Sequence, residues 1–569
     1  MTSRHLPTLR RLERLRTEFD GDAAAQKLVC LDELASARLP DARAVLRLHE
    51  VLCFLRAYPD DRRVLARVET LLHAFARRAD LRRHADELSD TGLSGTAIHY
   101  PFFASTAAWL ARRFPAHLDV DWDALEDEQE QRLLDRLDLL VSYSETPALD
   151  ELDLDLRPWL ARLGNARERP GAFLARRFAA LAAGETLKES YYDELGLPLV
   201  LRPGPGTPTR TLARARLTGP VVFQERALRR GRPEVPAALE RAPRVRELTR
   251  AQGARMIALA REAMVTRGRD LDVFAYGDAN DVRLLECEDG LAFAAIGFRP
   301  ERRLLLEAVY GFLTLKNGVP IGYVLNSALC GSAEVAFNVF EAFRGAEAGH
   351  VYGWVLSCVR HLFAVDTFTI YPYQLGQDND EALASGAWWF YQKLGFRPRH
   401  AGTLALMRRE LARTRRRPEA RSSRATLVRL AEHNLYYSLG RVRHDVIGEL
   451  ALGALGLAVS RFLAERFGSE RERGERECAR LAARRLGLRS LAGWSAGERL
   501  AWRRWAPLLL LFPEVERWSR AERRAAVAVV RAKGGRRESD FARRFDAHAG
   551  LRAALVRLTR AEARSQASR

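Results

Sequence analysis

The feature that most constrains the fold is a change in hydrophobic pattern that occurs twice along the chain of 569 residues. From residue 8 to about 200, Leu and Ala recur at three- and four-residue intervals, as in AVLRLHEVLCFLRAY (44–58), which predicts amphipathic helices. β-Branched and aromatic residues become frequent between 281 and 372, and the helical pattern returns from 425 to the end. This order predicts a multidomain α and α+β protein with a mixed centre between helical regions.

The central block contains segments typical of strands. They are DVRLLEC (281–287), LAFAAIGF (291–298), the long segment 307–329, AEVAFNVF (333–340) and TFTIYP (367–372). Within the long segment, Lys316-Asn317-Gly318 predicts a tight hairpin turn, because Asn-Gly readily adopts positive φ angles. Helical patterns lie around these strands. They cover 248–266, 349–363 and about 381–394.

Stretches rich in Pro, Gly or Arg mark candidate boundaries between domains. Pro and Gly are frequent in 202–220 and 229–243, and RTRRRPEARSSR (413–424) is strongly basic. These stretches divide the chain into five predicted segments. They are an all-α region (1–215), a connector (216–243), an α+β domain (244–412), a basic linker (413–424) and an all-α, Arg-rich region (425–569).

The excess positive charge belongs to the C-terminal part of the chain. The 92 Lys+Arg and 73 Asp+Glu give a net charge of +19. Residues 401–569 hold 38 basic and 18 acidic residues, which leaves residues 1–400 nearly neutral. The C-terminal helices could therefore meet an acidic partner, one candidate being the acidic stretch 118–156 of the same chain. Nucleic acid is disfavoured, because the arginines alternate with Glu, as in RERGERECAR (471–480), and no nucleic-acid-binding motif is found.

The sequence predicts a cytoplasmic protein. Its six cysteines lie far apart without a CxxC pair, which disfavours a disulfide framework or a Cys-based zinc site. The N-terminal segment has no apolar core of a signal peptide. The longest weakly polar run, 447–460, is too short to span a bilayer and contains Glu449, so no transmembrane segment is expected.

Two motifs in the centre could carry chemistry. The first, NVFEAFRGAEAG (338–349), follows a predicted strand and leads into the helix HVYGWVLSCVRHLF. Small residues at such a turn let backbone N–H groups approach a phosphate, and the helix N-terminus adds partial positive charge. The second, WWFYQKLGFRP (388–398), follows about forty residues later.

This order of motifs resembles the GNAT superfamily of acyl-CoA-dependent N-acyltransferases, over roughly residues 245–410. In that superfamily Arg/Gln-x-x-Gly-x-Gly/Ala follows the fourth strand, and a segment like FYxKLGF follows the fifth. The resemblance implies a GNAT-like sheet and acetyl-CoA or another acyl-CoA as co-substrate. Glu347 replaces the middle glycine, and its carboxylate would repel a diphosphate unless it turns away. The implied contacts to the coenzyme are Arg344, Gly345, Ala346, Ala348 and Gly349.

The resemblance also implies catalytic residues. Tyr391 stands where a superfamily tyrosine protonates the leaving thiolate, and a phenol with a pKa near 10 suits that role. Simple packing of Tyr391 against the sheet is an equally open reading. Some members use a glutamate about ten residues before the Arg/Gln position as the general base. Glu334 occupies that place, with Glu341 as second choice, although an exposed carboxylate at a strand end would look the same.

The loop YPYQLGQDNDEALASGAWW (371–389) is typical of segments that shape a substrate pocket. Asn379 and Asp380 could receive a cationic amine there, or could simply begin the next helix. The superfamily asparagine before the FY pair is not matched, because Ala384 has that spacing. His350 could meet a phosphate or pack inside the protein. No HExxH or other metal-binding motif is present, so no metal is expected.

We therefore predict an enzyme that transfers an acyl group from acyl-CoA to an unidentified amine. The helical flanks would then position a large acceptor or a partner. The first alternative is a GNAT-like fold that has lost catalysis and serves as a binding or scaffold module. The second is that the basic C-terminal region binds nucleic acid or an anionic membrane.

Overall fold

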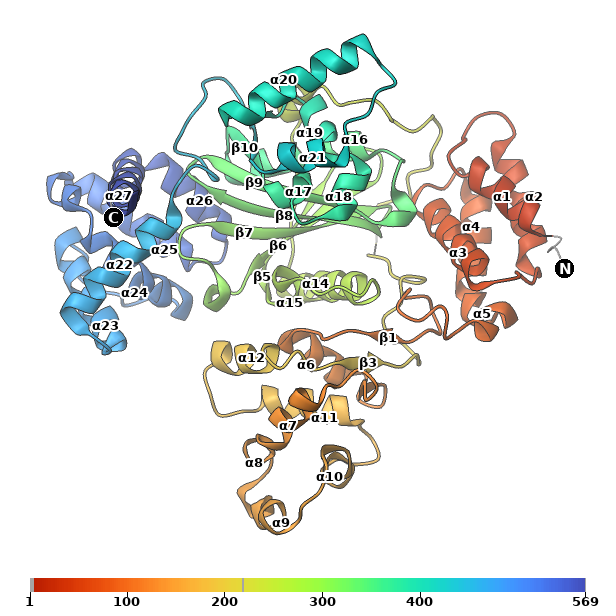
Figure 1. Cartoon of the computed structure of the whole chain (residues 1–569), viewed down its shortest axis with the longest axis horizontal. Helices are drawn as coiled ribbons and strands as arrows, with labels where there is room; N and C mark the ends of the chain where they lie inside the picture. The colour runs from red at the N-terminus through yellow and green to blue at the C-terminus, as the bar shows by residue number, and fades with distance from the viewer. Residues whose placement is uncertain (1–4, 217–218, 568–569) are drawn as a thin grey trace.

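The computed structural model describes residues 5–216 and 219–567, and the side chains of 565–567 are not described. Parts of the predicted segments 1–215, 216–243 and 425–569 therefore lie outside the described residues. The chain forms a large central sheet with a helical bundle, a separate lobe and a C-terminal helical region around it (Figure 1).

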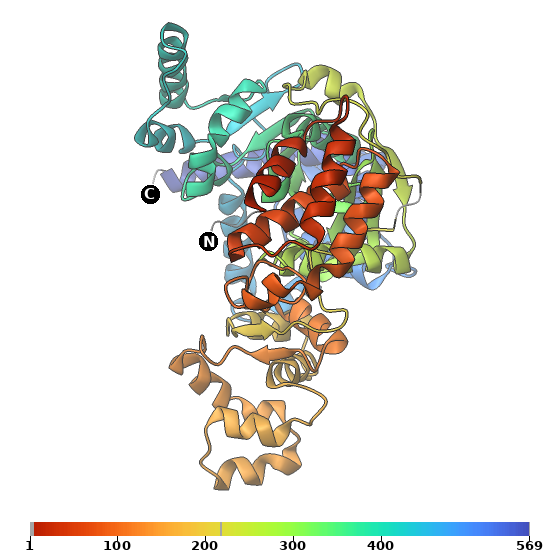
Figure 2. The same ribbon diagram turned by 90° about the vertical axis from the view of Figure 1, so that its right-hand side faces the viewer.

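The first part of the chain is a bundle of helices packed against one end of the central sheet (Figure 2). Its apolar residues share one hydrophobic core with the sheet, which explains why this bundle is not a separate globule. Its helices are α1 (Leu6–Leu15), α2 (Ala23–Ala35), α3 (Ala42–Ala57), α4 (Arg62–Ala74) and α5 (Ala79–Arg83).

Residues 98–201 form a lobe with a hydrophobic core of its own. The expectation of an all-α region over 1–215 is wrong here, because three short segments pair as a small antiparallel sheet, with β3 between β1 and β2. The strands are β1 (Ile98–His99), β2 (Leu118–Val120) and β3 (Leu199–Leu201). The helices are α6 (Ala104–Arg113), α7 (Asp127–Leu134), α8 (Leu137–Leu140), α9 (Thr146–Glu151), α10 (Leu156–Leu163), α11 (Pro170–Ala179) and α12 (Glu185–Asp193).

The central sheet is mixed, as expected. The order of its described strands is β11-β12-β10-β9-β8-β7-β6-β5-β4, and only the pair β9–β10 is parallel. The strands are β4 (Arg244–Glu247), β5 (Gly277–Glu286), β6 (Leu291–Phe298), β7 (Ala308–Lys316), β8 (Val319–Leu329), β9 (Ser332–Val339), β10 (Thr367–Ile370), β11 (Arg397–Pro398) and β12 (Leu435–Ser438).

The predicted hairpin turn between β7 and β8 is confirmed. Asn317 and Gly318 have φ angles of 48° and 79°, the positive values that a tight turn needs. Asn317 is buried, and its amide nitrogen donates to the carbonyl oxygens of Ala57 and Val222, each at 2.9 Å. The turn therefore joins the N-terminal bundle to the sheet.

Helices cover the two faces of the sheet. Gly311 lies so close to Val273 and Phe274 that a side chain there would clash, which places α15 (Asp272–Ala275) on one face. Helix α14 (Arg250–Val265) contacts both α15 and β5. The aromatic rings of Phe337 and Tyr352 are 5.3 Å apart, which places α16 (Ala348–Phe363) on the other. Successive side chains of a strand point to opposite faces of the sheet, so residues two positions apart on one strand lie on the same face.

Strands β9 and β10 separate partway along their length. They pair only from Ser332 to Glu334 on β9, opposite Thr367 to Thr369 on β10. Strand β9 continues to Val339, whereas β10 ends at Ile370 and Pro372 begins the short helix α17 (Pro372–Leu375). Proline lacks an N–H group and cannot extend the strand pairing, so the sheet opens beyond this point.

The predicted boundaries around 413–424 are wrong. Helix α20 (Ala401–Arg416) runs into the predicted linker, α21 (Arg424–Ala431) follows it, and β12 then pairs antiparallel with both β10 and β11. The region 425–569 is therefore not all helical. The single helix expected over 381–394 is also two helices, α18 (Asp380–Ser385) and α19 (Ala387–Lys393), because Gly386 adopts a φ of 69°.

Of the remaining helices, α26 (Glu538–Ala547) packs on β7 and β8, and its neighbours in sequence pack against it. Buried polar contacts hold this region in place: Glu538 accepts a hydrogen bond from Lys533 at 2.5 Å, and Lys533 also donates to the carbonyl oxygen of Glu307. Within the described ranges, no helix is both long and apolar enough to cross a membrane. The helices are α22 (Leu452–Phe467), α23 (Arg471–Leu486), α24 (Ala496–Leu510), α25 (Arg520–Lys533), α26 (Glu538–Ala547) and α27 (Ala549–Ala567).

Candidate active site

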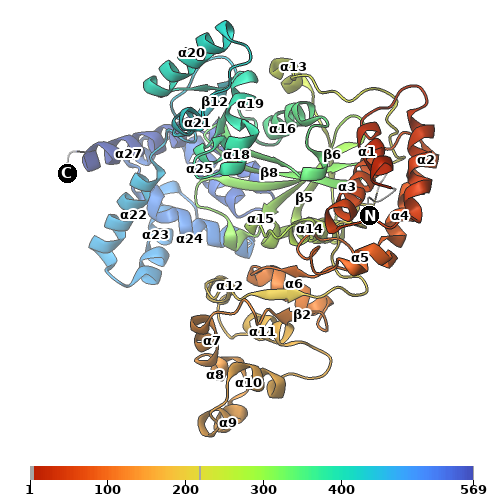
Figure 3. The same cartoon turned by 45° about the vertical axis from the view of Figure 1, so that its right-hand side comes forward.

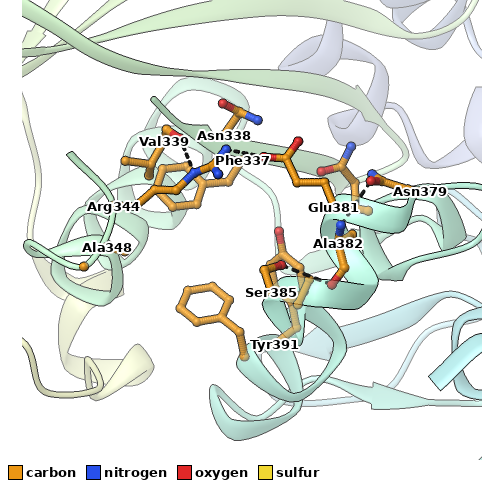
Figure 4. A pocket seen from close by; sticks show the side chains of 14 residues that line it. Phe337, Asn338, Val339, Arg344, Ala348, Asn379, Glu381, Ala382, Ser385 and Tyr391 are labelled. Carbon is orange, nitrogen blue, oxygen red and sulfur yellow. Dashed lines mark hydrogen bonds and ion pairs between the residues drawn. The ribbon is translucent and has the colours of Figure 1, made fainter. Parts of the chain in front are cut away.

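A pocket of about 380 Å³ lies where β9 and β10 separate (Figure 4). The end of β9, the loop before α16 and the helices α17–α19 enclose it. Both sequence motifs contribute to its wall, so residues about fifty positions apart meet there. The lining residues are Phe337, Asn338, Val339, Arg344, Gly345, Ala348, Gln374, Asn379, Glu381, Ala382, Ser385, Ala387, Phe390 and Tyr391.

The loop from β9 to α16 leaves several backbone donors unpaired. Gly345 has a φ of 78°, and a Cβ atom placed on it would meet no other atom within 4 Å. Among the described residues, no hydrogen-bond acceptor is found for a set of backbone N–H groups at the start of α16. The set comprises Gly345, Glu347, Ala348, Gly349 and His350. Unpaired donors at a helix N-terminus, next to an arginine, suit an anionic ligand.

Arg344 reaches across the pocket to α18. Its guanidinium donates to the carboxylate of Glu381 and, at 3.3 Å, to the carbonyl oxygen of Val339, as Figure 4 shows. Both charged side chains are about half exposed. Glu381 therefore competes with any anion that would bind Arg344.

Glu347 turns away from the pocket. Its side chain is buried, accepts a hydrogen bond from the backbone N–H of Arg229 at 3.1 Å, and pairs with Lys316 at 3.3 Å. Burial lowers the pKa of Lys316, and the neighbouring carboxylate opposes that shift. Lys316 thus neutralises the carboxylate of Glu347 inside the protein, which removes most of the repulsion that this charge would exert on a diphosphate.

Gly349 does not line the pocket. A Cβ atom there would lie 3.0 Å from the carbonyl oxygen of Gly231 and 3.3 Å from Pro233. Gly353, one helical turn further on, faces Pro233 as well. The connector thus packs against this side of α16, and α13 (Val235–Glu240) continues the contact. Ala346 is buried and also lies outside the lining.

Tyr391 lies in the pocket wall on α19. Its ring is buried and packs edge-on against Tyr352 at 5.5 Å, so the packing role is real. Its hydroxyl group nevertheless has no hydrogen-bond partner among the described residues, and burial raises its pKa above the ordinary value. A buried phenol without a partner at a pocket wall can donate a proton to a bound ligand.

Glu334 lies on the opposite face of the sheet. It differs by three positions from Phe337, so the two side chains point to opposite faces. Glu334 is paired across the strands with Ser327 and Thr369, at the last position before β10 separates. Burial, and secondarily the neighbouring Glu307, raises its pKa to about 7. Glu341 is exposed on a 3₁₀ turn and does not line the pocket.

The two residues predicted to bind an amine have structural roles. Asn379 lines the pocket, but its side-chain oxygen caps α18 through Ala382 N–H and its amide donates to the carbonyl oxygen of Tyr373. Asp380 is 81% exposed, pairs with Arg424 at 2.6 Å, and lies outside the lining. His350 is buried beside the loop, and its Nε2 atom has no described partner.

Sequence reasoning missed the polar residues that α17 and α18 supply to the pocket. These residues, Gln374, Glu381 and Ser385, belong to the loop that we expected to shape a pocket. They line the pocket because the helix breaks at Gly386. The four-residue spacing of Glu381 and Ser385 places them on one side of α18, a signal that the sequence does contain.

No group of three or more metal-ligating side chains is found in the described part of the chain. The chain matches no protein-family model, no curated protein and no solved structure at a significant level. A function must therefore be inferred from the geometry of the site.

Proposed function

We propose that the protein is an acyl-CoA-dependent N-acyltransferase of GNAT type, with an active site at the opening between β9 and β10. The observation that carries the proposal is this opening, because it lies between a pocket wall with Tyr391 and a sheet face with Glu334. A donor and an acceptor could then approach from opposite faces and react between the strands.

The pocket supports a coenzyme A arm as the ligand. Its volume of about 380 Å³ is within the usual range of small-molecule sites. Arg344 and the unpaired N–H groups around Gly345 and Ala348 offer donors for a diphosphate. Because the connector covers Gly349, the proposed contact runs through Gly345 and Ala348.

The proposed reaction is direct acyl transfer. Glu334 takes a proton from the acceptor ammonium, and the resulting amine nitrogen attacks the thioester carbonyl carbon. An amide C–N bond forms while the C–S bond breaks, Tyr391 donates its proton to the leaving thiolate, and the second proton that the attacking nitrogen loses restores the Tyr391 phenol. A pKa of about 7 suits Glu334 as a base, because at neutral pH its side chain is deprotonated, and so able to accept a proton, in about half of the molecules.

A scaffold without catalysis is the second candidate. Three positions that we expected to take part in ligand binding, two from the superfamily pattern and one from the loop 371–389, make internal contacts here. Glu347 binds Lys316, Gly349 faces the connector, and Asn379 caps a helix. A scaffold role predicts that coenzyme A does not bind.

Calorimetric titration of the full chain with acetyl-CoA tests both candidates. The enzyme proposal predicts saturable binding, weakened by Arg344→Ala, followed by thiol release when a panel of primary amines is added. Absence of binding at about millimolar ligand would contradict the enzyme and favour the scaffold. Binding without thiol release would show that the pocket takes the coenzyme but that the acceptor differs from the amines supplied.

A further inference from the structure

A second, larger cavity lies far from the candidate active site. Its volume is about 990 Å³, and loop 439–445 and one side of α27 form its walls. We call it the basic cleft. The α27 residues in its wall recur at three- and four-residue intervals, so they form one helix face. Its lining residues are Asp366, Leu439, Arg441, Val442, Arg443, His444, Asp445, Ala549, Arg552, Ala553, Val556, Arg557, Arg560, Ala561 and Arg564.

The floor of the basic cleft is internally neutralised. Arg443 pairs with Asp366 at 2.8 Å and with Asp445 at 3.0 Å, and Arg552 lies 3.5 Å from Asp445. These contacts fix the loop against α27. They also occupy Asp366 and Asp445, the two carboxylates of the lining. No carboxylate among the described residues of the cleft is therefore left to pair with the arginines of the rim.

The rim of the basic cleft combines free charge with exposed apolar surface. Arg441 and Arg560 are exposed and form no ion pair with any described residue. Val442 is 54% exposed beside them, and Val556 and Ala561 continue the apolar surface. No Phe, Tyr or Trp side chain is found in the described lining, and the ring of His444 has its Nδ1 atom 2.8 Å from the carboxylate of Glu449, so the cleft offers no row of aromatic side chains on which successive bases could stack.

The lobe of residues 98–201 presents the complementary surface. Residues 138–155, which we call the acidic tip, contain six acidic residues and no basic one. None of the six carboxylates forms an ion pair with a described residue. Three large apolar side chains are exposed in the same short segment, which is unusual for a purely solvated acidic surface. They are Leu139 (53%), Tyr143 (91%) and Leu152 (49%).

The two surfaces do not meet within one chain. Figures 1 and 3 show α8 and α9 at the far end of the lobe and α27 on another side of the molecule. The ion pairs of stretch 118–156 stay within the lobe or directly next to it, as for Asp119 with Arg169 and Arg202 and Glu128 with Arg132. The intrachain pairing considered from the sequence is thus not found among the described residues.

We infer that the basic cleft of one copy binds the acidic tip of a second copy. The match is twofold, because opposite charges and exposed apolar side chains occur together on both surfaces. Tyr143 would lie on the apolar part of the rim near Val442 while the carboxylates meet Arg441 and Arg560, the combination of aromatic anchor and arginine common at interfaces. Because the two surfaces differ and point in different directions, the contact is head-to-tail and leads to a ring or a filament.

Analytical ultracentrifugation of the full chain tests this inference at about 50 and about 500 mM salt. We expect association at low salt that weakens at high salt. The cleft variant Arg441→Glu/Arg560→Glu and the tip variant Asp150→Lys/Asp153→Lys should each weaken association at least tenfold, since like charges then face each other. A mixture of the two variants should associate again, because each reversed surface finds its complement.

The matched control is Arg408→Glu/Arg409→Glu, which makes the same charge change at exposed arginines on α20. It should leave association unchanged, and Tyr143→Ala should weaken association at both salt concentrations. A wild-type protein that stays monomeric at both, or a control variant as defective as the cleft variant, would overturn the inference. Binding of a short RNA or DNA duplex that the cleft variant loses, without self-association, would also overturn it and make nucleic acid the occupant.

Discussion

Glu347 and Lys316 form an ion pair at 3.3 Å in which each side chain is only 4% exposed. The pair joins the loop at the start of α16 to the β7–β8 turn. The ammonium of Lys316 also lies 4.7 Å from the ring centre of Tyr58, at the end of α3. The N-terminal bundle thus supports the candidate active site through one buried cation.

Replacing Glu347 with alanine should destabilise this loop. Lys316 would remain buried without its partner, which typically costs about 3–5 kcal/mol. Hydrogen exchange at the hydrogen-bonded amides that follow, beginning with Val351, whose N–H donates to the carbonyl oxygen of Glu347, should report the loss as faster local opening. The double variant Lys316→Met/Glu347→Leu should recover most of it. Glu477→Ala removes an exposed ion pair with Arg480 and should cost less than about 1 kcal/mol.

Tyr391→Phe should reduce kcat by about a hundredfold, because the leaving thiolate loses its proton donor. The affinity for acetyl-CoA, measured by calorimetry, should change little. Tyr352→Phe is the matched control, since its hydroxyl is buried without a partner and lies outside the pocket lining. Equal effects of the two substitutions would assign Tyr391 a packing role only.

The rate of acyl transfer should rise with pH around a midpoint near 7. Glu334 has a pKa raised to about 7 and can act as a base only after it loses its proton. Glu334→Gln should remove this dependence along with most of the rate. Glu307→Gln should move the midpoint to lower pH, because a neighbouring negative charge is lost. A profile unchanged in Glu334→Gln would exclude Glu334 as the base.

Glu381→Gln should tighten the binding of acetyl-CoA severalfold. The substitution frees Arg344 from its partner across the pocket and removes a negative charge from the wall. Arg344→Ala should weaken binding about tenfold. Asp380→Asn is the control, because this carboxylate is adjacent in sequence but pairs with Arg424 outside the pocket. Weaker binding in Glu381→Gln would show that the glutamate holds Arg344 in place.

Gly345→Ala and Gly349→Ala should have separable effects. Gly345 has a φ of 78° and lines the pocket, so an alanine there costs about 1–2 kcal/mol of strain and should weaken coenzyme binding. An alanine at Gly349 would push against Gly231 instead. It should loosen the connector, seen as faster hydrogen exchange at the hydrogen-bonded amides of Arg229 and Arg230, with unchanged affinity for acetyl-CoA.

The central strands could be predicted because their sequences carry local signals. Strand β6 covers the predicted residues 291–298, and Asn317-Gly318 marks the only turn needed between β7 and β8. Strand β12 could not be predicted in the same way. Its four residues lie between helical segments, and what makes them a strand is pairing with β10, which ended 65 residues earlier.

The candidate site was predictable in part. Arg344, Gly345, Ala348 and Tyr391 share one pocket because both motifs follow strands that end at the same edge of the sheet. The ion pair of Arg344 with Glu381 was not predictable, since it depends on where α18 begins after a loop. The same holds for Gly349, whose neighbour is a connector segment more than a hundred residues away in the sequence.

The place of β12 also sets an order of assembly during synthesis. Strands β10 and β11 leave the ribosome first. They are connected in the sheet only through β12 (435–438), which pairs with both and emerges after α20 and α21. Until then the backbone N–H and C=O groups along one edge of β10 have no partner, and an exposed strand edge favours association with other chains. While the residues between β11 and β12 are being synthesised, the nascent chain therefore carries this unpaired edge, and a chaperone that shields β10 would act then.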